Sequence, residues 1–368
     1  MYILKPDGFE LLLRTHKEKG YQITGPKIRD GAVVLGTIDS SSRMPRGVRD
    51  HHGPGRYRLE ETGDGSWFSY TLGSDSWKKL FYPSSRRLYE STRNGGLLEI
   101  SAEPARESLK ALIGVRPCEL KALAVQDKVL AEGEYVDRHY VAARRDNFIV
   151  AVNCTVPGGT CFCASMGSGP RAGGGYDIAL TELGGDGDGR FLARSGTHLG
   201  EELLAATASA KADESDLELE NRLLEAATAM MGRTLDTDGL AAQLADASDH
   251  PRWEEVAERC QACANCTMVC PTCYCHTVED STDLSGSTAE RTRVWDSCFT
   301  ADHSYLHGGS VRESRSARYK QWLTHKLSSW HDQFGSSGCT GCGRCITWCP
   351  VGIDITEEAQ AVRKTARG

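Results

Sequence analysis

Runs of apolar residues divide the chain into a first part of mixed helices and strands and a second part rich in helices. Residues 9–14 hold a leucine cluster that predicts an early helix. Short apolar runs at residues 32–36, 111–115 and 148–152 are typical of buried strands. A turn-rich stretch at residues 184–189 precedes alanine- and glutamate-rich sequence, which predicts a long helical region from about residue 200 to residue 232.

This pattern predicts three regions. Residues 1–195 are expected to form an α/β (or α+β) domain, residues 196–234 a helical connector, and residues 235–368 a mainly helical domain. Within the last region, residues 276–338 form an insert whose local signals are helical and loop-like. With 368 residues, of which 39% are hydrophobic, the chain is long enough for two domains and a substantial core.

The two later apolar runs each lead into a cysteine. Residues 111–115 are followed by Cys118, and residues 148–152 are followed by Cys154. Open α/β sheets usually keep their functional sites at the carboxyl ends of their strands. We therefore expect Cys118 and Cys154 to share one location.

One cysteine motif occurs twice in the last region. Both copies read Cys-x2-Cys-x2-Cys-x3-Cys-Pro, and they begin at Cys260 and Cys339. This spacing holds [4Fe–4S] clusters in two-cluster ferredoxins, in which the fourth cysteine of each copy binds the other cluster. Zinc ribbons need only two CxxC pairs, so they do not account for the repeat. The motif predicts a two-cluster ferredoxin-like domain that transfers electrons.

The same cross-binding rule assigns the ligands of both clusters. Each cluster is expected to take three cysteines from one copy of the motif and the fourth from the other copy. The first cluster is predicted on Cys260, Cys263, Cys266 and Cys349. The second cluster is predicted on Cys339, Cys342, Cys345 and Cys270.

The cysteine count bears on the cellular compartment. Fifteen cysteines in a chain without an amino-terminal signal pattern favour metal ligation over a disulfide scaffold, so we expect a cytoplasmic protein. No apolar stretch approaches about 20 residues, and no membrane insertion is expected. The formal charge of −7 becomes more negative when each cluster adds about −2, which disfavours nucleic acid as a partner.

Four further cysteines account for every cysteine in the first 195 residues. They are Cys118, Cys154, Cys161 and Cys163. Four is the number that a third iron–sulfur cluster needs, but only the CxC pair is close in sequence, and this spacing is less specific than CxxCxxC. A third cluster is one hypothesis; buried structural thiols and a redox-active or zinc site are the others.

Three cysteines exceed the needs of the two predicted clusters. They are Cys273, Cys275 and Cys298. One hypothesis places them next to a cluster, where thiols can donate weak hydrogen bonds to its sulfides. The other hypothesis is a further metal site completed by His276 or His303.

The insert is also rich in positive charge around Tyr319, Trp322 and Leu323. The cations are Arg312, Arg315, Arg318, Lys320 and Lys326. A solvated helix face and a docking patch for an acidic partner are the two interpretations. The chain contains no HExxH or GxSxG pattern, so we expect the substrate chemistry to belong to another chain.

A glycine-rich segment at residues 166–175 could offer backbone N–H groups to a phosphate. It matches neither GxGxxG with a downstream acidic residue nor GxxxxGK[ST]. We therefore expect a flexible loop that covers the nearby cysteines rather than a nucleotide site.

Several segments together resemble a known family over nearly the whole chain. They are GVRPCEL at residues 114–120, NC at 153–154, CFCASMG at 161–167, CPTCYC at 270–275, WDSC at 295–298 and GCGRC at 341–345. The combination is similar to the beta (iron–sulfur) subunit of soluble NAD(P)-linked nickel–iron hydrogenases, also called sulfhydrogenases. It is also similar to the A component of anaerobic sulfite reductase. Many relatives carry aspartate in place of Glu119, which leaves the cysteine assignments unchanged.

The resemblance implies an electron-transfer subunit of an oxidoreductase complex. Such a chain would relay single electrons between a diaphorase subunit, which carries FAD and NAD(P), and the small and large subunits of a nickel–iron hydrogenase. The resemblance also implies a metal site at the four cysteines of the first domain. The alternatives are the same relay in a siroheme sulfite reductase and a cluster-based redox sensor or scaffold.

Overall fold

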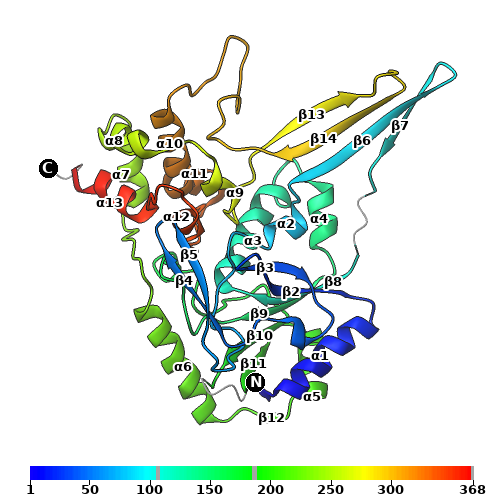
Figure 1. Ribbon diagram of the computed structural model, residues 1–368, viewed down its shortest axis with the longest axis vertical. Coiled ribbons are helices and arrows are strands. Elements are labelled where there is room, and N and C mark those ends of the chain that lie inside the picture. Colours follow the sequence, from blue (N-terminus) through cyan, green and yellow to red (C-terminus); the bar gives the residue numbers. More distant parts are fainter. Residues whose placement is uncertain (105–107, 185–188, 366–368) are drawn as a thin grey trace.

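The computed structural model describes residues 1–104, 108–184 and 189–365. Figure 1 shows a sheet-centred part that contains the N-terminus, a helical part that contains the end of the chain, and a long β-ribbon arm. The centre of the predicted turn-rich stretch, residues 185–188, lies outside the described residues. No helix among the described residues is both long enough and apolar enough to cross a membrane.

An eight-stranded mixed sheet forms the first part, in the order β12–β1–β11–β10–β9–β8–β2–β3. The central neighbours β2, β8, β9 and β10 are parallel, and the outer pairs are antiparallel. The strands are β1 (Tyr2–Leu4), β2 (Gln22–Arg29), β3 (Ala32–Thr37), β8 (Lys110–Val115), β9 (Phe148–Val152), β10 (Ile178–Glu182), β11 (Phe191–Ser195) and β12 (Ala210–Lys211). The three predicted strands are therefore confirmed as β3, β8 and β9.

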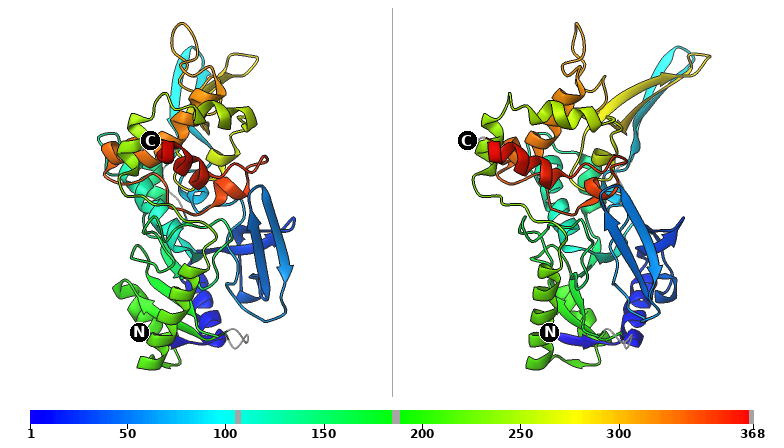
Figure 2. Two further views of the ribbon diagram at one scale, coloured as in Figure 1. Left: turned by 90° about the vertical axis from the view of Figure 1, so that its left-hand side faces the viewer. Right: turned by 60° about the vertical axis from the view of Figure 1, so that its left-hand side comes forward.

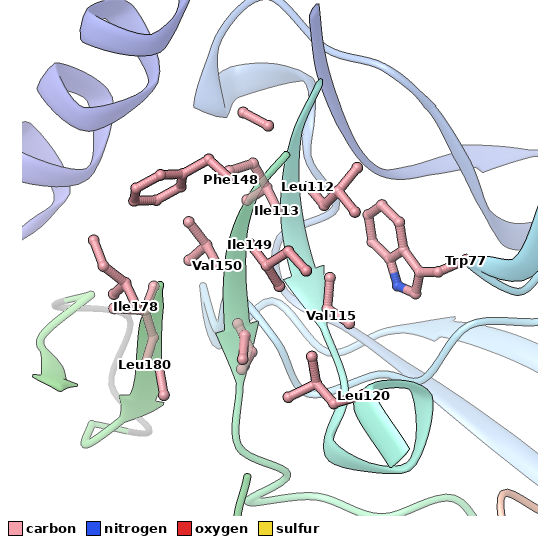
Figure 3. Close-up of a cluster of buried hydrophobic side chains, with 14 of the residues drawn as sticks. Trp77, Leu112, Ile113, Val115, Leu120, Phe148, Ile149, Val150, Ile178 and Leu180 are labelled. Carbon is pink, nitrogen blue, oxygen red and sulfur yellow. The ribbon is translucent and has the colours of Figure 1, made fainter. Parts of the chain in front are cut away.

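The centre of this sheet is apolar on both faces. Every residue of β8, β9 and β10 is buried, as expected for parallel strands that are covered on both sides. Figure 3 shows their aliphatic side chains packed together, with Trp77 and Leu120 beside β8. This packing fixes where the carboxyl ends of β8 and β9 emerge.

Short helices cover the sheet. The predicted early helix is confirmed as α1, which starts with a proline in its first turn and buries Phe9, Leu12 and Leu13. The helices of this part are α1 (Pro6–Glu18), α2 (Lys78–Phe81), α3 (Pro117–Leu130) and α4 (Arg138–Arg144), with a 3₁₀ turn at Ser41–Arg43. Helix α3 begins two residues after β8, so its first turn carries Cys118.

The connector contains two helices rather than one long helix. Helix α5 (His198–Thr207) ends before the short edge strand β12, and helix α6 (Glu214–Ala229) follows. Asp213 caps α6 in a reciprocal arrangement with Asp216, which gives this helix its own start. The alanine and glutamate content indicated helix, but the capping residue divides the region.

A four-stranded antiparallel sheet forms the arm, in the order β13–β14–β6–β7. The right-hand view in Figure 2 shows it extending away from the body. Its strands are β6 (Ser85–Asn94), β7 (Leu97–Ala102), β13 (His276–Thr282) and β14 (Thr288–Trp295). The expectation of helices and loops throughout the insert is wrong for residues 276–295, because their strands are stabilised by pairing with the distant β6.

The helical part surrounds the two cysteine motifs and has its own core. A separate two-stranded hairpin, β4 (Val48–Gly53) with β5 (Arg56–Glu61), lies against it. The helices are α7 (Leu240–Asp246), α8 (Arg252–Arg259), α9 (Asn265–Met268), α10 (Arg315–Thr324), α11 (Trp330–Phe334), α12 (Arg344–Thr347) and α13 (Ile355–Thr365), with a π-helical turn at His325–Ser329. Phe162 of the first part belongs to this second core.

Candidate metal centres

The structure brings three cysteines of the first motif together with the last cysteine of the second. Cys260 ends helix α8, Cys266 lies in α9, and both line one cavity with Cys263 and Cys349. The rest of the cavity wall is mainly apolar and includes Phe299, Tyr319, Trp322, Val351 and Ile353. Cys263 is exposed, so this cavity lies near the protein surface.

The other four motif cysteines also lie close to one another. Burial raises the pKa of Cys339 to about 12, and the neighbouring thiols of Cys342 and Cys270 contribute in the same direction. The pKa of Cys345 is raised by burial and by the same three cysteines. Cys266 influences Cys345 as well, so the two sets of four are adjacent.

The backbone around these cysteines suits cluster binding. The N–H groups of Ala262, Gly341 and Ile353 point at the Sγ atoms of Cys260, Cys339 and Cys349 at 3.4, 3.4 and 3.3 Å. Such N–H···S bonds are among the features that set cluster potentials. Ala262 and Ala264 have φ angles of 52° and 66°, so the loop of the first motif is wound in an uncommon left-handed conformation.

The cysteines of the first domain form a third set. The strands β8 and β9 are adjacent and parallel, so the predicted shared location of Cys118 and Cys154 is confirmed. Cys163 interacts electrostatically with Cys161, Cys154 and Cys118. Cys154, Cys161 and Cys163 are buried, and Cys118 is half-buried.

The third set lies directly beside the second. The thiol of Cys161 is 3.8 Å from the carbonyl oxygen of Cys342, and the N–H of Phe162 donates to the Gly341 carbonyl at 2.8 Å. A Cβ atom at Gly341 would lie 2.6 Å from the Phe162 backbone, so the two loops pack without room for a side chain. The three cysteine sets therefore form a continuous series.

Buried cations accompany the cysteine sets. Lys326, on the π-helical turn, donates to Thr272 Oγ1 at 3.0 Å, and Cys270 Sγ lies 3.2 Å from the same oxygen. Burial alone would lower the pKa of Lys326, but the thiols of Cys270 and Cys273 raise it well above its usual value. A positive charge at this position compensates the negative charge of thiolate ligands.

Two buried arginines also accompany the cysteine sets. Arg344 forms an ion pair with Glu119, and both side chains are 5% exposed or less. Arg116 donates to the Phe68 carbonyl at 2.7 Å and hydrogen-bonds the thiol of Cys154. Both arginines belong to segments GVRPCEL and GCGRC, which carry the family resemblance.

The three surplus cysteines gather on the side of the arm. Cys273 contacts Cys270, and Cys275 contacts both Cys298 and His303. His276 instead lies 2.9 Å from the hydroxyl of Tyr82. No three His, Cys, Asp or Glu side chains among the described residues form a group that could hold a single metal ion.

Most cations of the insert serve internal contacts. Lys326 is buried, and three others donate to backbone carbonyls at 2.8–3.0 Å: Arg315 to Cys260, Arg318 to Phe299 and Lys320 to Ser248. Tyr319, Trp322 and Leu323 are core residues. These contacts support neither a simple solvated face nor a free docking patch for these four cations.

The glycine-rich segment passes over the third cysteine set. The N–H of Ser168 donates to the Cys163 carbonyl at 3.0 Å. A Cβ atom at Gly169 would lie 2.9 Å from the Cys163 sulfur. Residues 168 and 169 therefore lie against Cys163, as expected for a loop that covers a nearby cysteine.

The sequence analysis missed the contribution of the β4–β5 hairpin. His52 Nδ1 lies 3.2 Å from Thr347 Oγ1, and Tyr57 stacks on Trp348 at 5.4 Å between ring centroids. The other ring nitrogen of His52, Nε2, forms a hydrogen bond with the Asp50 carboxylate. The adjacent histidines at 51 and 52 were the only signal, and their spacing matched no known motif.

Comparisons with known proteins match both the region of the cysteine motifs and most of the chain. Residues 259–353, which span both motif copies and the insert, match the family model of a 4Fe-4S dicluster domain. The chain is 32% identical over 313 residues to the Sulfhydrogenase 2 subunit beta of Pyrococcus furiosus, and the match covers 84% of this chain and 89% of that protein. No solved structure matches the chain.

Proposed function

The chain belongs to the family of sulfhydrogenase beta subunits, and from this premise we propose that it is the iron–sulfur electron-transfer subunit of a hydrogenase complex. The observation that carries the proposal is the pairing of cysteines across the two motifs. Three cysteines of the first motif share a mainly apolar cavity with Cys345 and Cys349 of the second, and Cys349 acts electrostatically on both Cys260 and Cys266. This is the arrangement in which two-cluster ferredoxins bind their clusters.

Two [4Fe–4S] clusters are proposed at these sites. The ligand sets are Cys260, Cys263, Cys266 and Cys349, and Cys339, Cys342, Cys345 and Cys270. Such clusters, when bound, supply one-electron oxidation and reduction. The chain would tune them with backbone N–H donors and with apolar side chains that exclude water, since potential depends on both.

A third iron–sulfur cluster is proposed on Cys118, Cys154, Cys161 and Cys163. The proposal rests on their mutual proximity and on the 3.8 Å contact between Cys161 and the second motif. Arg116 supplies a buried positive charge beside Cys154. The three sets would then form a path through the chain, with exposed Cys263 at one end and half-buried Cys118 at the other.

The partners proposed for this path follow from the family. One end would exchange electrons with a diaphorase subunit that carries FAD and NAD(P), and the other with the small and large subunits of a nickel–iron hydrogenase. A cytoplasmic location is proposed on the basis of the cysteine-rich composition. Substrate chemistry would take place on the partner chains.

The first test is to tag this chain in its native host, purify the complex without oxygen, and determine nickel, flavin, siroheme and iron in the same sample. Nickel together with flavin is the expected result. Siroheme without nickel would move the assignment to the relay of a sulfite reductase. A sample with neither would favour a redox sensor or scaffold.

A second test addresses the third cluster. The isolated wild-type chain should contain about 12 iron atoms, and Cys161→Ala should lose about four of them while the other two clusters keep their electron paramagnetic resonance signals. A wild-type chain with about eight iron atoms would contradict the third cluster without affecting the other two.

A further inference from the structure

Cys275, Cys298 and His303 form a constellation that the electron path does not use. Cys275 immediately precedes strand β13, and the N–H of Asp296 donates to its carbonyl at 2.9 Å, which extends the β13–β14 pairing by one step. Cys298 follows two residues after Asp296. The hairpin thus brings together two cysteines that are 23 positions apart in the sequence.

The thiols of these two cysteines are neighbours. Each shifts the pKa of the other, downward at Cys275 and upward at Cys298. Cys270 and Cys273 form a second close pair, but Cys270 is assigned to a cluster. The Cys275–Cys298 pair has no such assignment.

A histidine and an aspartate complete the arrangement. The side chain of His303 contacts the thiol of Cys275, and its Nδ1 lies 2.7 Å from Asp296 Oδ2. Asp296 is fixed in turn by Thr300, which donates to its Oδ1 at 2.6 Å. A cysteine, a histidine and an orienting carboxylate in this order are the groups that generate a nucleophilic thiolate.

The electrostatics agree with that chemistry. Hydrogen bonds from Cys298 and His303 outweigh burial and lower the pKa of Cys275 to about 4. The contact with Cys275 and the hydrogen bond to Asp296 raise the pKa of His303 to about 9 against the effect of burial. Lys326 adds a further positive charge facing Cys275. At neutral pH the pair is therefore a thiolate next to an imidazolium.

We propose that Cys275 and Cys298 form a redox-active dithiol that reduces low-molecular-weight disulfides. His303 and Asp296 act as positioning residues. The side chains of His303 and Asp296 are 18% and 15% exposed, and both cysteines are half-buried, so a small disulfide can reach the site. The proposal goes beyond the relay function and does not depend on it.

The exchange proceeds in two balanced steps. The Cys275 thiolate attacks one sulfur of the disulfide R–S–S–R, so that a Cys275–S–S–R bond forms and RS⁻ leaves. Cys298 then loses its proton and attacks the Cys275 sulfur, which releases the second RS⁻ and closes the Cys275–Cys298 disulfide. One small disulfide is reduced to two thiols, and the protein dithiol is oxidised.

The test uses the full chain with its iron, purified without oxygen and treated with oxidised glutathione. Free thiols are trapped at low pH by alkylation, and the peptides are analysed by mass spectrometry. The expected product is a Cys275–Cys298 disulfide, with two glutathione molecules released. In Cys298→Ser, a mixed disulfide between glutathione and Cys275 should accumulate instead, because the second thiol is missing.

The role of His303 is tested by the pH profile of Cys275 alkylation with iodoacetamide. In the wild type, the rate should change little between pH 8 and pH 6. In His303→Asn, the pKa of Cys275 should rise, although Cys298 and Lys326 still lower it, so the rate should fall clearly between pH 8 and pH 6. His307→Asn is the matched control, since His307 is exposed on the same loop, and it should behave as the wild type does.

Iron content serves as the folding check for every variant. The proposal would be overturned if Cys275 and Cys298 in iron-loaded protein neither react with iodoacetamide nor form a disulfide with glutathione. It would also be overturned if the two cysteines proved to be ligands of a metal, since their substitution would then remove metal from the purified chain. A flat pH profile in His303→Asn would refute the assignment of His303.

Discussion

The buried ion pair between Arg344 and Glu119 joins the two parts of the molecule, and its removal should have a large effect. Arg344 lies between two cysteines of the second motif, and Glu119 lies next to Cys118 in the first turn of α3. Each partner is held by a further contact: Arg344 Nε donates to the Gly73 carbonyl at 3.2 Å, and Glu119 Oε2 accepts from the Trp77 N–H at 2.9 Å.

Replacing Arg344 by methionine would leave the Glu119 carboxylate buried without its cation. Glu119 is 0% exposed, so water cannot take the place of the guanidinium. Breaking a buried pair in this way typically costs about 3–5 kcal/mol, much more than the loss of a surface pair. We expect the urea midpoint of unfolding to fall by roughly 1–2 M for a slope of about 3 kcal/mol per molar urea.

The double variant Glu119→Leu with Arg344→Met separates charge burial from loss of packing. Because it leaves no charge unpaired, it should recover most of the lost stability. Arg344→Lys keeps the charge but loses the planar fork, so it should lie between the wild type and Arg344→Met. The assay is anaerobic urea unfolding followed by tryptophan fluorescence, with iron content measured on each sample.

Two results would refute this reasoning. If Arg344→Met unfolded within about 0.5 kcal/mol of the wild type, the pair would behave as a solvated surface contact. If the double variant were as unstable as Arg344→Met, the loss would come from packing around the arginine rather than from an unpaired carboxylate.

Other contacts in the structure give three further predictions. Gly341→Ala should lose iron because its Cβ would lie 2.6 Å from the Phe162 backbone. Gly335 has the same φ of 65° but no atom within 4 Å of the position that a Cβ would take, so the control Gly335→Ala should keep its iron and lose only about 1–2 kcal/mol of unfolding free energy. Cys349→Ala should damage the first cluster and Cys270→Ala the second; the opposite pairing in electron paramagnetic resonance spectra would contradict cross-ligation. Burial would raise the pKa of Glu220, but hydrogen bonds from two arginines and a threonine lower it. The ionised Glu220 therefore stabilises the folded state fully above the unfolded pKa of about 4.3, and this stabilisation is lost as the pH falls through the lower folded pKa. Glu220→Gln should therefore be less stable than the wild type at pH 7, and thermal unfolding should show the difference shrinking toward pH 3; a constant difference would contradict this.

The sequence predicted the parts of the site that depend on short-range rules. The spacing of the motifs brought Cys349 to the first set, because the fourth cysteine follows a turn that leads back across the core. Parallel pairing brought Cys118 and Cys154 together, because the apolar runs before them form adjacent strands. In both cases the local pattern and the tertiary structure agree.

The parts that the sequence did not predict depend on pairing between distant segments. Strand β13 is exposed along its whole length, so it lacks the alternation of apolar and polar residues that marks a half-buried strand. Strand β14 pairs with β6, about 200 positions earlier in the chain. For the same reason, the hypothesis of a histidine beside the surplus cysteines named both His276 and His303, and only the hairpin geometry places His303 at Cys275.

Buried charge explains why the cysteine sets and the surrounding fold depend on each other. Lys326, Arg116 and Arg344 are each 4% exposed or less, and burial raises the pKa of one cysteine beside each of them: Cys339, Cys154 and Cys118. Such neutral thiols compensate the cations less than the thiolates of a cluster with a charge of about −2 would. Metal binding would then deprotonate the cysteines and stabilise the cations in the same step. The two arginines come from a strand end in the first part and a motif loop in the second. Binding of a cluster at one cysteine set would therefore favour the packing that brings the cysteines of the other sets together.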